Sequence, residues 1–142
     1  MSKPSLSALA TTCLIFGLLA GCAGDSEQQL IASARAYLAK RELSAAAIEL
    51  KRALDKNGRS EEARMLLGKV LLEDGDPAAA EVELRRAHEL ATNKDRVAPD
   101  LARAMLLVGQ ASKVVEQFAE VSLRDTTAHA ELKAWVAAGL GG

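Results

Sequence analysis

Apolar residues recur at helical spacing through the segment 61–94, which contains the clearest copy of a pattern that returns along the chain. Between its two apolar runs lies Gly75-Asp76-Pro77. Glycine can adopt the left-handed backbone that ends a helix, aspartate can cap the next one, and proline suits a first helical position. The segment therefore predicts a helix–turn–helix hairpin whose apolar positions are Leu67, Val70 and Leu71, then Val82, Leu84, Ala87 and Leu90.

The same pattern returns once before and once after this segment, at a step of about 34 residues that we call the period. Gly75 and Gly109 hold the turn, and five apolar positions keep the step. They are Ala34, Gly68 and Ala102; Tyr37, Leu71 and Met105; Ala46, Ala80 and Val114; Leu50, Leu84 and Phe118; and Ala53, Ala87 and Val121. Small residues let helices approach closely where they cross. We therefore expect the small members of these sets to be helix-packing sites: Ala34, Gly68, Ala102, Ala46, Ala80, Ala53 and Ala87.

This period and these five sets resemble the tetratricopeptide repeat family. The resemblance implies an all-α solenoid of about 3.5 stacked helix–turn–helix repeats. The repeats would span residues 27–60, 61–94 and 95–128, and a partial repeat or C-terminal helix would occupy 129–142.

Helix boundaries follow from capping signals. Ser26 and Gln29 predict a capping box before a helix over 27–40, and Asn57-Gly58 should end a second helix over 44–57. Ser60 should cap the third helix. A later pair should begin near 97–100 and continue over 112–120, and Thr126 or Thr127 should cap a last helix that runs through Trp135.

The final residues, Gly139-Leu140-Gly141-Gly142, come before a second helix of a fourth repeat could form. Solenoid ends need a polar cap, and Trp135, Val136 and Leu140 do not supply one. We therefore expect a chain that is truncated or continued in its parent gene. The alternative is that the last helix is itself the cap.

The N-terminal segment 1–21 is predicted to be a targeting segment. Lys3 precedes an apolar stretch from Leu6 to Ala20 that is short for a membrane-spanning helix. It ends in Leu19-Ala20-Gly21-Cys22, which resembles a bacterial lipobox, so 1–21 would be removed and 22–26 would be a lipidated tether. Cys22 would carry the lipid, and Ala23 resembles the outer-membrane sorting pattern. The alternative is an ordinary secretory signal with an incidental cysteine.

Composition narrows the function classes. The chain is 49% hydrophobic but only 3% aromatic, which favours a helical core of Ala, Leu and Val, and a net charge of −1 argues against nucleic-acid binding. Apart from Cys22 the only cysteine is Cys13, inside the targeting segment, so we expect no disulfide, no metal and no cofactor beyond a covalent lipid. His88 and His129 lie far apart in the repeat array, and neither has partners at catalytic spacing, so no enzyme activity is predicted.

In the tetratricopeptide family the first helix of each repeat lines a concave groove. There the resemblance places Arg35, Lys69 and Arg103, which we call the cation row, with Leu38, Leu72 and Leu106 one turn further along. Such a surface would suit an extended acidic or C-terminal peptide or an anionic polysaccharide. The alternative is that the charges solvate a helix face and the leucines pack between repeats.

From Cys22 to about Trp135 the chain looks like the start of the tetratricopeptide-repeat lipoproteins of exosortase/PEP-CTERM systems. The segments that carry this resemblance are 30–40, 46–54, 63–69 and 75–81. It implies a periplasm-facing scaffold, anchored in the outer membrane, that binds protein components of exopolysaccharide export. Two alternatives stay open: a general envelope-assembly lipoprotein for outer-membrane protein insertion or pilus biogenesis, or a noncatalytic piece of a larger envelope complex.

Overall fold

Seven α-helices and one short 3-10 helix make up the part of the chain that the computed structural model describes, residues 24–141, and no strand occurs there. The all-α prediction is therefore confirmed. The predicted signal segment 1–21 and the lipidation site Cys22 lie outside the described residues. The elements are α1 (Glu27–Ala39), α2 (Leu43–Lys56), α3 (Glu61–Asp74), α4 (Pro77–Leu90), η1 (Lys94–Arg96), α5 (Ala98–Leu107), α6 (Ala111–Phe118) and α7 (Thr126–Leu140).

Side-chain caps fix the starts of the first, third and fourth helices. The Ser26 hydroxyl accepts from the Gln29 amide at 3.3 Å while the Gln29 side chain accepts from the Ser26 amide at 2.7 Å, which is the predicted capping box. Ser60 caps α3 and Asp76 caps α4, with Pro77 as the first helical residue. These caps are confirmed, and each stabilises its helix by about 1 kcal/mol.

Left-handed residues end the first helix of each hairpin. Gly75 and Gly109 adopt φ values of 86° and 77°, as their sequence positions predict. The matching residue one period before Gly75 is Arg41, which adopts a φ of 62° although it has a side chain. The three hairpin turns therefore share one backbone conformation, which the sequence signals in only two of them.

The same hydrogen bond closes all three turns. In each one the amide after the left-handed residue donates to the carbonyl five residues earlier, the bond of a Schellman cap. The N···O distances are 3.0 Å for Glu42 to Tyr37, 2.9 Å for Asp76 to Leu71 and 2.8 Å for Gln110 to Met105. Donors and acceptors both step by one period.

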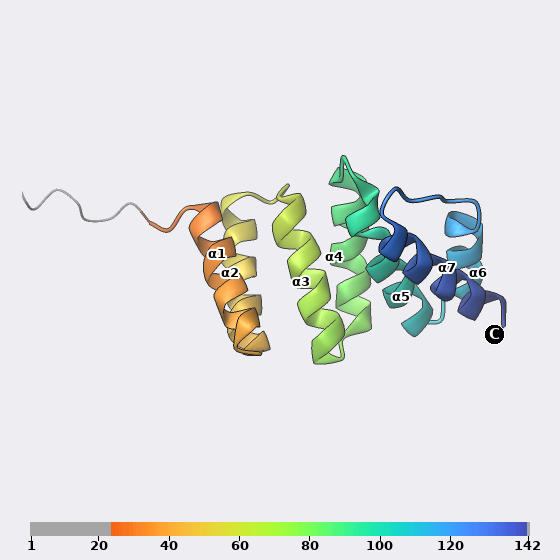
Figure 1. Ribbon diagram of the computed structural model, residues 1–142. Coiled ribbons are helices and arrows are strands. Elements are labelled where there is room, and N and C mark those ends of the chain that lie inside the picture. The colour runs from red at the N-terminus through yellow and green to blue at the C-terminus, as the bar shows by residue number, and fades with distance from the viewer. Residues whose placement is uncertain (1–23, 142) are drawn as a thin grey trace, which may run out of the picture.

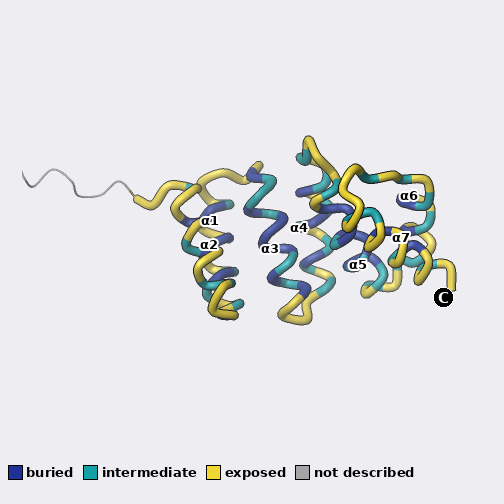
Figure 2. The backbone as a smooth tube through the Cα atoms, viewed as in Figure 1, coloured by how far each residue is buried: buried dark blue, intermediate teal, exposed yellow. Residues whose placement is uncertain are grey.

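The helices follow one another along one direction, so that the N-terminal and C-terminal ends lie at opposite ends of the array (Figure 1). Helices α1 to α4 stand side by side, and α5, α6 and α7 form a second group in which α7 packs against both α5 and α6. Buried residues line the faces where helices meet, and exposed residues concentrate at the turns (Figure 2). One continuous apolar core thus runs along the array.

The small residues expected at helix crossings are buried. Gly68 is buried in α3, and a β-carbon there would lie 2.8 Å from Cδ2 of Leu84 in α4, closer than real contacts allow. This close approach explains why glycine occupies the position. The other expected packing sites are each 0% exposed: Ala34, Ala102, Ala46, Ala80, Ala53 and Ala87.

The C-terminal part departs from the predicted boundaries. Helix α5 starts only at Ala98, after η1, because a helix begun earlier would bring the ring of Pro99 against the carbonyl of residue 95. The cap of α7 is Asp125, which accepts from the Ala128 amide at 2.8 Å, so the predicted Thr126 or Thr127 cap is wrong. A carboxylate at this end also interacts favourably with the helix dipole.

Helix α7 extends to Leu140, five residues beyond the predicted end at Trp135. Gly139 does not terminate it. A β-carbon on Gly139 would lie 3.2 Å from the carbonyl oxygen of Ala111 and 3.3 Å from Cγ2 of Val115, so α7 approaches α6 closely at this glycine. The glycine is a helix-packing residue, and the prediction that it ends the helix is wrong.

Candidate functional site

Three surface depressions lie along the face formed by α1, α3, α5 and α7, which we call the groove face. The first depression lies between α1 and α3, the central one between α3, η1, α5 and α7, and the last between α5 and α7. Their volumes are ≈ 440, ≈ 410 and ≈ 350 Å³. The first and central depressions use equivalent positions, since Met65 and Lys69 follow Ile31 and Arg35 by one period.

The cation row contributes one residue to each depression. Arg35 lines the first, Lys69 the central and Arg103 the last. The side chains of Arg35 and Lys69 are 50% and 44% exposed, so both remain accessible to a ligand. The predicted cation positions therefore share one face and each lies in a concave part of it.

Each cation also reaches across to the first helix of the next hairpin. Arg35 of α1 pairs with Glu62 of α3, and Lys69 of α3 pairs with Asp100 of α5, Nζ to Oδ2 at 3.2 Å. Arg103 of α5 instead lies over the indole of Trp135 in α7, with its guanidinium carbon 5.9 Å from the ring centroid. The cations thus tie neighbouring helices together, and the third contact replaces an ion pair with a cation–π contact.

The leucines predicted beside the cations serve packing. Leu72 is only 7% exposed and belongs to the core, while Leu38 and Leu106 are half-buried and pack against it. None of the three lines the depressions described here. In residues 24–141 the groove face therefore presents cations and their partners, without an open leucine stripe.

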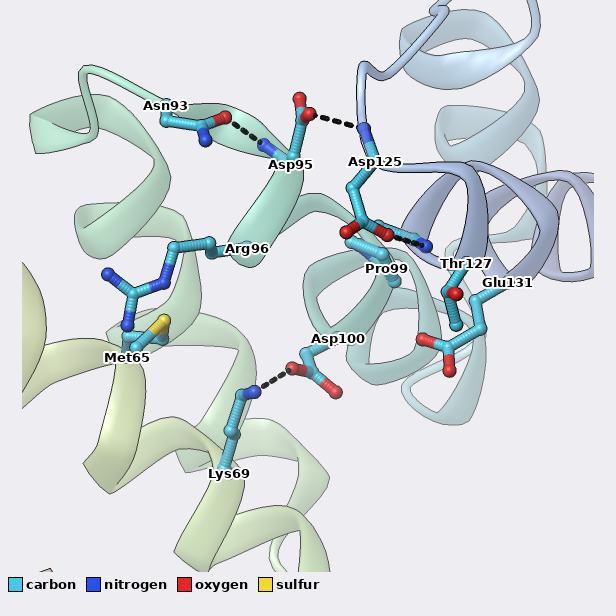
Figure 3. Close-up of a pocket in the computed structure, with 11 residues that line it drawn as sticks. Met65, Lys69, Asn93, Asp95, Arg96, Pro99, Asp100, Asp125, Thr127 and Glu131 are labelled. Atoms are coloured by element: carbon cyan, nitrogen blue, oxygen red, sulfur yellow. Dashed lines mark hydrogen bonds and ion pairs between the residues drawn. The ribbon is translucent and has the colours of Figure 1, made fainter.

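Asp95 shapes the central depression (Figure 3). Its Oδ2 accepts from the backbone amides of Arg124 and Asp125 at 2.8 and 2.9 Å, and its own amide donates to the Asn93 side chain at 3.0 Å. These bonds hold the segment before α7 against η1. Sequence reasoning assigned Asp95 no role, because its partners lie 29 and 30 residues further along the chain.

The two sides of the central depression carry opposite charges. Figure 3 shows Lys69 and Arg96 on the side of α3 and η1, and Asp100 and Glu131 on the side of α5 and α7. Lys69 and Asp100 pair with each other. Arg96 and Glu131 form no ion pair with any residue in the range 24–141. A ligand with hydrogen-bonding groups of both kinds matches this depression.

A buried ion pair inside the second hairpin was also missed from the sequence. Arg64 of α3 pairs with Glu83 of α4, and the two side chains are only 12% and 19% exposed. Arg64 also donates from Nε and Nη2 to the Gly58 carbonyl at 3.0 and 2.6 Å. The pair fixes the α3–α4 hairpin and the turn before it, away from the groove face.

The two histidines have structural contacts. The His88 ring packs edge-on against Phe118, with centroids 6.0 Å apart and planes at 85°. Burial lowers the pKa of His88 from its ordinary value, and the nearby charges of Lys94 and Arg85 lower it further. Nδ1 of His129 accepts from the Leu123 amide at 3.3 Å. Residues 24–141 contain no group of three or more His, Cys, Asp or Glu side chains that could hold a metal ion.

No helix in the described range has both the length and the continuous apolar character needed to cross a bilayer. Among the described residues, the groove face brings together the three depressions, the cation row and its cross-helix partners. No protein-family model matches this chain, and no curated protein matches it.

Proposed function

We propose that this protein is a membrane-anchored helical-repeat scaffold of the tetratricopeptide type that faces the periplasm and binds partner proteins. The scaffold is an accessory component of exopolysaccharide export in an exosortase/PEP-CTERM system. Its lipid is carried on Cys22, its anchor is in the outer membrane, and its binding surface is the groove face.

The repeat assignment is supported by the three hairpin turns. Their left-handed residues are Arg41, Gly75 and Gly109, and their closing hydrogen bonds step by the same period as the apolar sets. A period of about 34 residues with two helices in each unit is the signature of tetratricopeptide repeats. Stacked hairpins of this kind create extended concave surfaces for protein binding.

The observation that carries the binding proposal is the cation row. Three cations one period apart each line a depression on one face, and the two whose ion pairs fix the groove helices keep about half of their side chains exposed. Cations in a groove attract carboxylates of a partner chain, and charge-assisted hydrogen bonds are the stronger kind. A partner that binds there would therefore include acidic residues or a free C-terminus.

The export role follows from the resemblance to lipoproteins of exosortase/PEP-CTERM systems, and secreted polysaccharide tests it. A strain lacking the gene should lose secreted polymer, and the wild-type chain should restore it. A Glu replacement at Arg35, Lys69 and Arg103 together should fold and reach the membrane but fail to restore export. Normal polymer in the deletion strain would contradict the role and favour a general envelope-assembly lipoprotein.

The anchor is tested separately with Cys22→Ser, which removes the acyl-accepting thiol. We expect this variant to leave the membrane fraction, since two acyl chains contribute most of the membrane affinity at about 0.8 kcal/mol per buried methylene. Cys13→Ser is the matched control and should fractionate like the wild type. Retention of Cys22→Ser in the membrane would contradict lipidation.

A further inference from the structure

The last depression, between α5 and α7, differs from the other two in what lines it. Half of its six lining residues are apolar: Ala134, Trp135 and Ala138, all on α7. The remaining three are Asp100, Arg103 and Glu131. The central depression shares Asp100 and Glu131, so the two are adjacent on the groove face. This part of the groove therefore combines an apolar floor with a charged rim.

The unpaired charge of this rim is negative. The Asp100 carboxylate is paired with Lys69, and the Arg103 guanidinium lies over the indole of Trp135. Glu131 is exposed and has no ion-pair partner among residues 24–141. A ligand group that complements the last depression therefore has an apolar stem for the floor and a positive end for Glu131.

We propose that the last depression receives a lysine or arginine side chain of the bound partner polypeptide. The methylene stem packs on Trp135, Ala134 and Ala138, and the cationic head pairs with Glu131. Long basic side chains commonly bury their stems on apolar surface while the charged end stays hydrated. The proposal rests on the proposed function, because it specifies part of the sequence that the groove face selects: an acidic segment for the cation row, followed by a basic residue over α7.

The chain itself supplies the probe, because Trp135 is its only tryptophan. The full chain in detergent would be titrated with blocked short peptides that differ at one residue, carrying lysine, norleucine or glutamate. We expect the lysine peptide to change the tryptophan emission saturably and to bind more tightly than the other two. Norleucine keeps the stem without the charge, and glutamate reverses the charge.

Two variants separate the floor from the rim. Glu131→Gln should weaken the lysine peptide about two- to fivefold, the range of an exposed ion pair, and should leave the norleucine peptide unchanged. Glu120→Gln, at an exposed carboxylate outside the depression, is the matched control and should change neither. Ala134→Leu fills the floor and should weaken the lysine and norleucine peptides together.

Three results would overturn the proposal: equal binding of the lysine and norleucine peptides, tighter binding of the glutamate peptide, or no emission change with any peptide. An emission change only with an anionic oligosaccharide would overturn it in favour of a sugar subsite. These outcomes are distinguishable from failure of the proposed function. Loss of polymer in the deletion strain with no peptide response removes only the lysine pocket, whereas normal polymer removes the export role whatever the peptides do.

Discussion

Replacing Arg41 with glycine should stabilise the protein, although it removes a charged residue and a cross-helix contact. Arg41 adopts a φ of 62° at the end of α1, where Gly75 and Gly109 occupy the two equivalent turns. The left-handed conformation costs a residue with a side chain roughly 1–2 kcal/mol. Glycine removes that cost, but its more flexible unfolded chain offsets about 0.5–1 kcal/mol.

The expected net gain is therefore about 0.5–1 kcal/mol. The ion pair of Arg41 with Glu73 subtracts little, because the nitrogen and oxygen are 3.8 Å apart and the Arg41 side chain is 82% exposed. For a domain of this size such a gain corresponds to a rise in melting temperature of roughly 2–6 °C. Urea and thermal unfolding followed by circular dichroism would measure it.

Two controls separate the backbone effect from the loss of charge. Arg41→Ala removes the same ion pair but keeps a β-carbon, so it should not stabilise. Gly75→Ala is the reverse test: no atom outside the local backbone lies within 4 Å of the added β-carbon, so its expected cost of roughly 1–2 kcal/mol is purely conformational. A neutral Gly75→Ala, or an Arg41→Gly no more stable than Arg41→Ala, would refute the shared turn conformation.

Three further predictions concern packing, charge and pH. Gly68→Leu should lower the unfolding free energy by about 3 kcal/mol because its side chain would overlap Leu84; a melting curve like the wild type would contradict the crossing, and adding Leu84→Ala should restore part of the loss. Arg64→Met should cost about 2 kcal/mol in a denaturant titration by leaving the half-buried Glu83 unpaired, and adding Glu83→Gln should recover most of it; equal losses in the single and double variants would argue against the pair. Because folding lowers the pKa of His88 from 6.5, its neutral form favours the folded state, so stability should fall as pH drops below about 6.5, and His88→Gln should flatten that dependence; an unchanged slope in the variant would assign the dependence to other groups.

The sequence allowed the helices and the hairpin turns to be predicted because their determinants are local. Ser26, Ser60 and Asp76 each cap a helix through an amide three residues away, and Gly75 and Gly109 each end one. Arg41 escaped notice because its residue type does not favour the left-handed region. Its spacing of one period from Gly75 was the available signal.

The end of α7 was mispredicted because glycine has two uses. At Gly75 it supplies a positive φ, whereas at Gly139 it permits the close approach of α7 to the Ala111 carbonyl and Val115. The second use depends on a different helix, α6, which comes earlier in the sequence. Only the folded arrangement distinguishes the two.

The candidate site was predictable in its cations and not in their partners. Arg35, Lys69 and Arg103 keep the repeat spacing, so their common face follows from the period. Their partners Glu62, Asp100 and Trp135 occupy three different positions within the repeat, because each cation reaches whichever side chain the neighbouring helix offers. Long-range pairs of this kind leave no periodic signal.

Site-specific photo-crosslinking in cells is the most direct test that the groove face binds a partner. A photoreactive residue would replace Ala32 in the first depression or Thr127 in the central one, both exposed. Ile48 on α2 and Val82 on α4, which are 59% and 45% exposed and line none of the three depressions, are the matched controls. Both groove positions should capture the same protein, and the Glu replacement of the cation row should abolish that capture. Equal capture from Ile48 or Val82, or capture that survives the charge reversal, would contradict binding through the groove face.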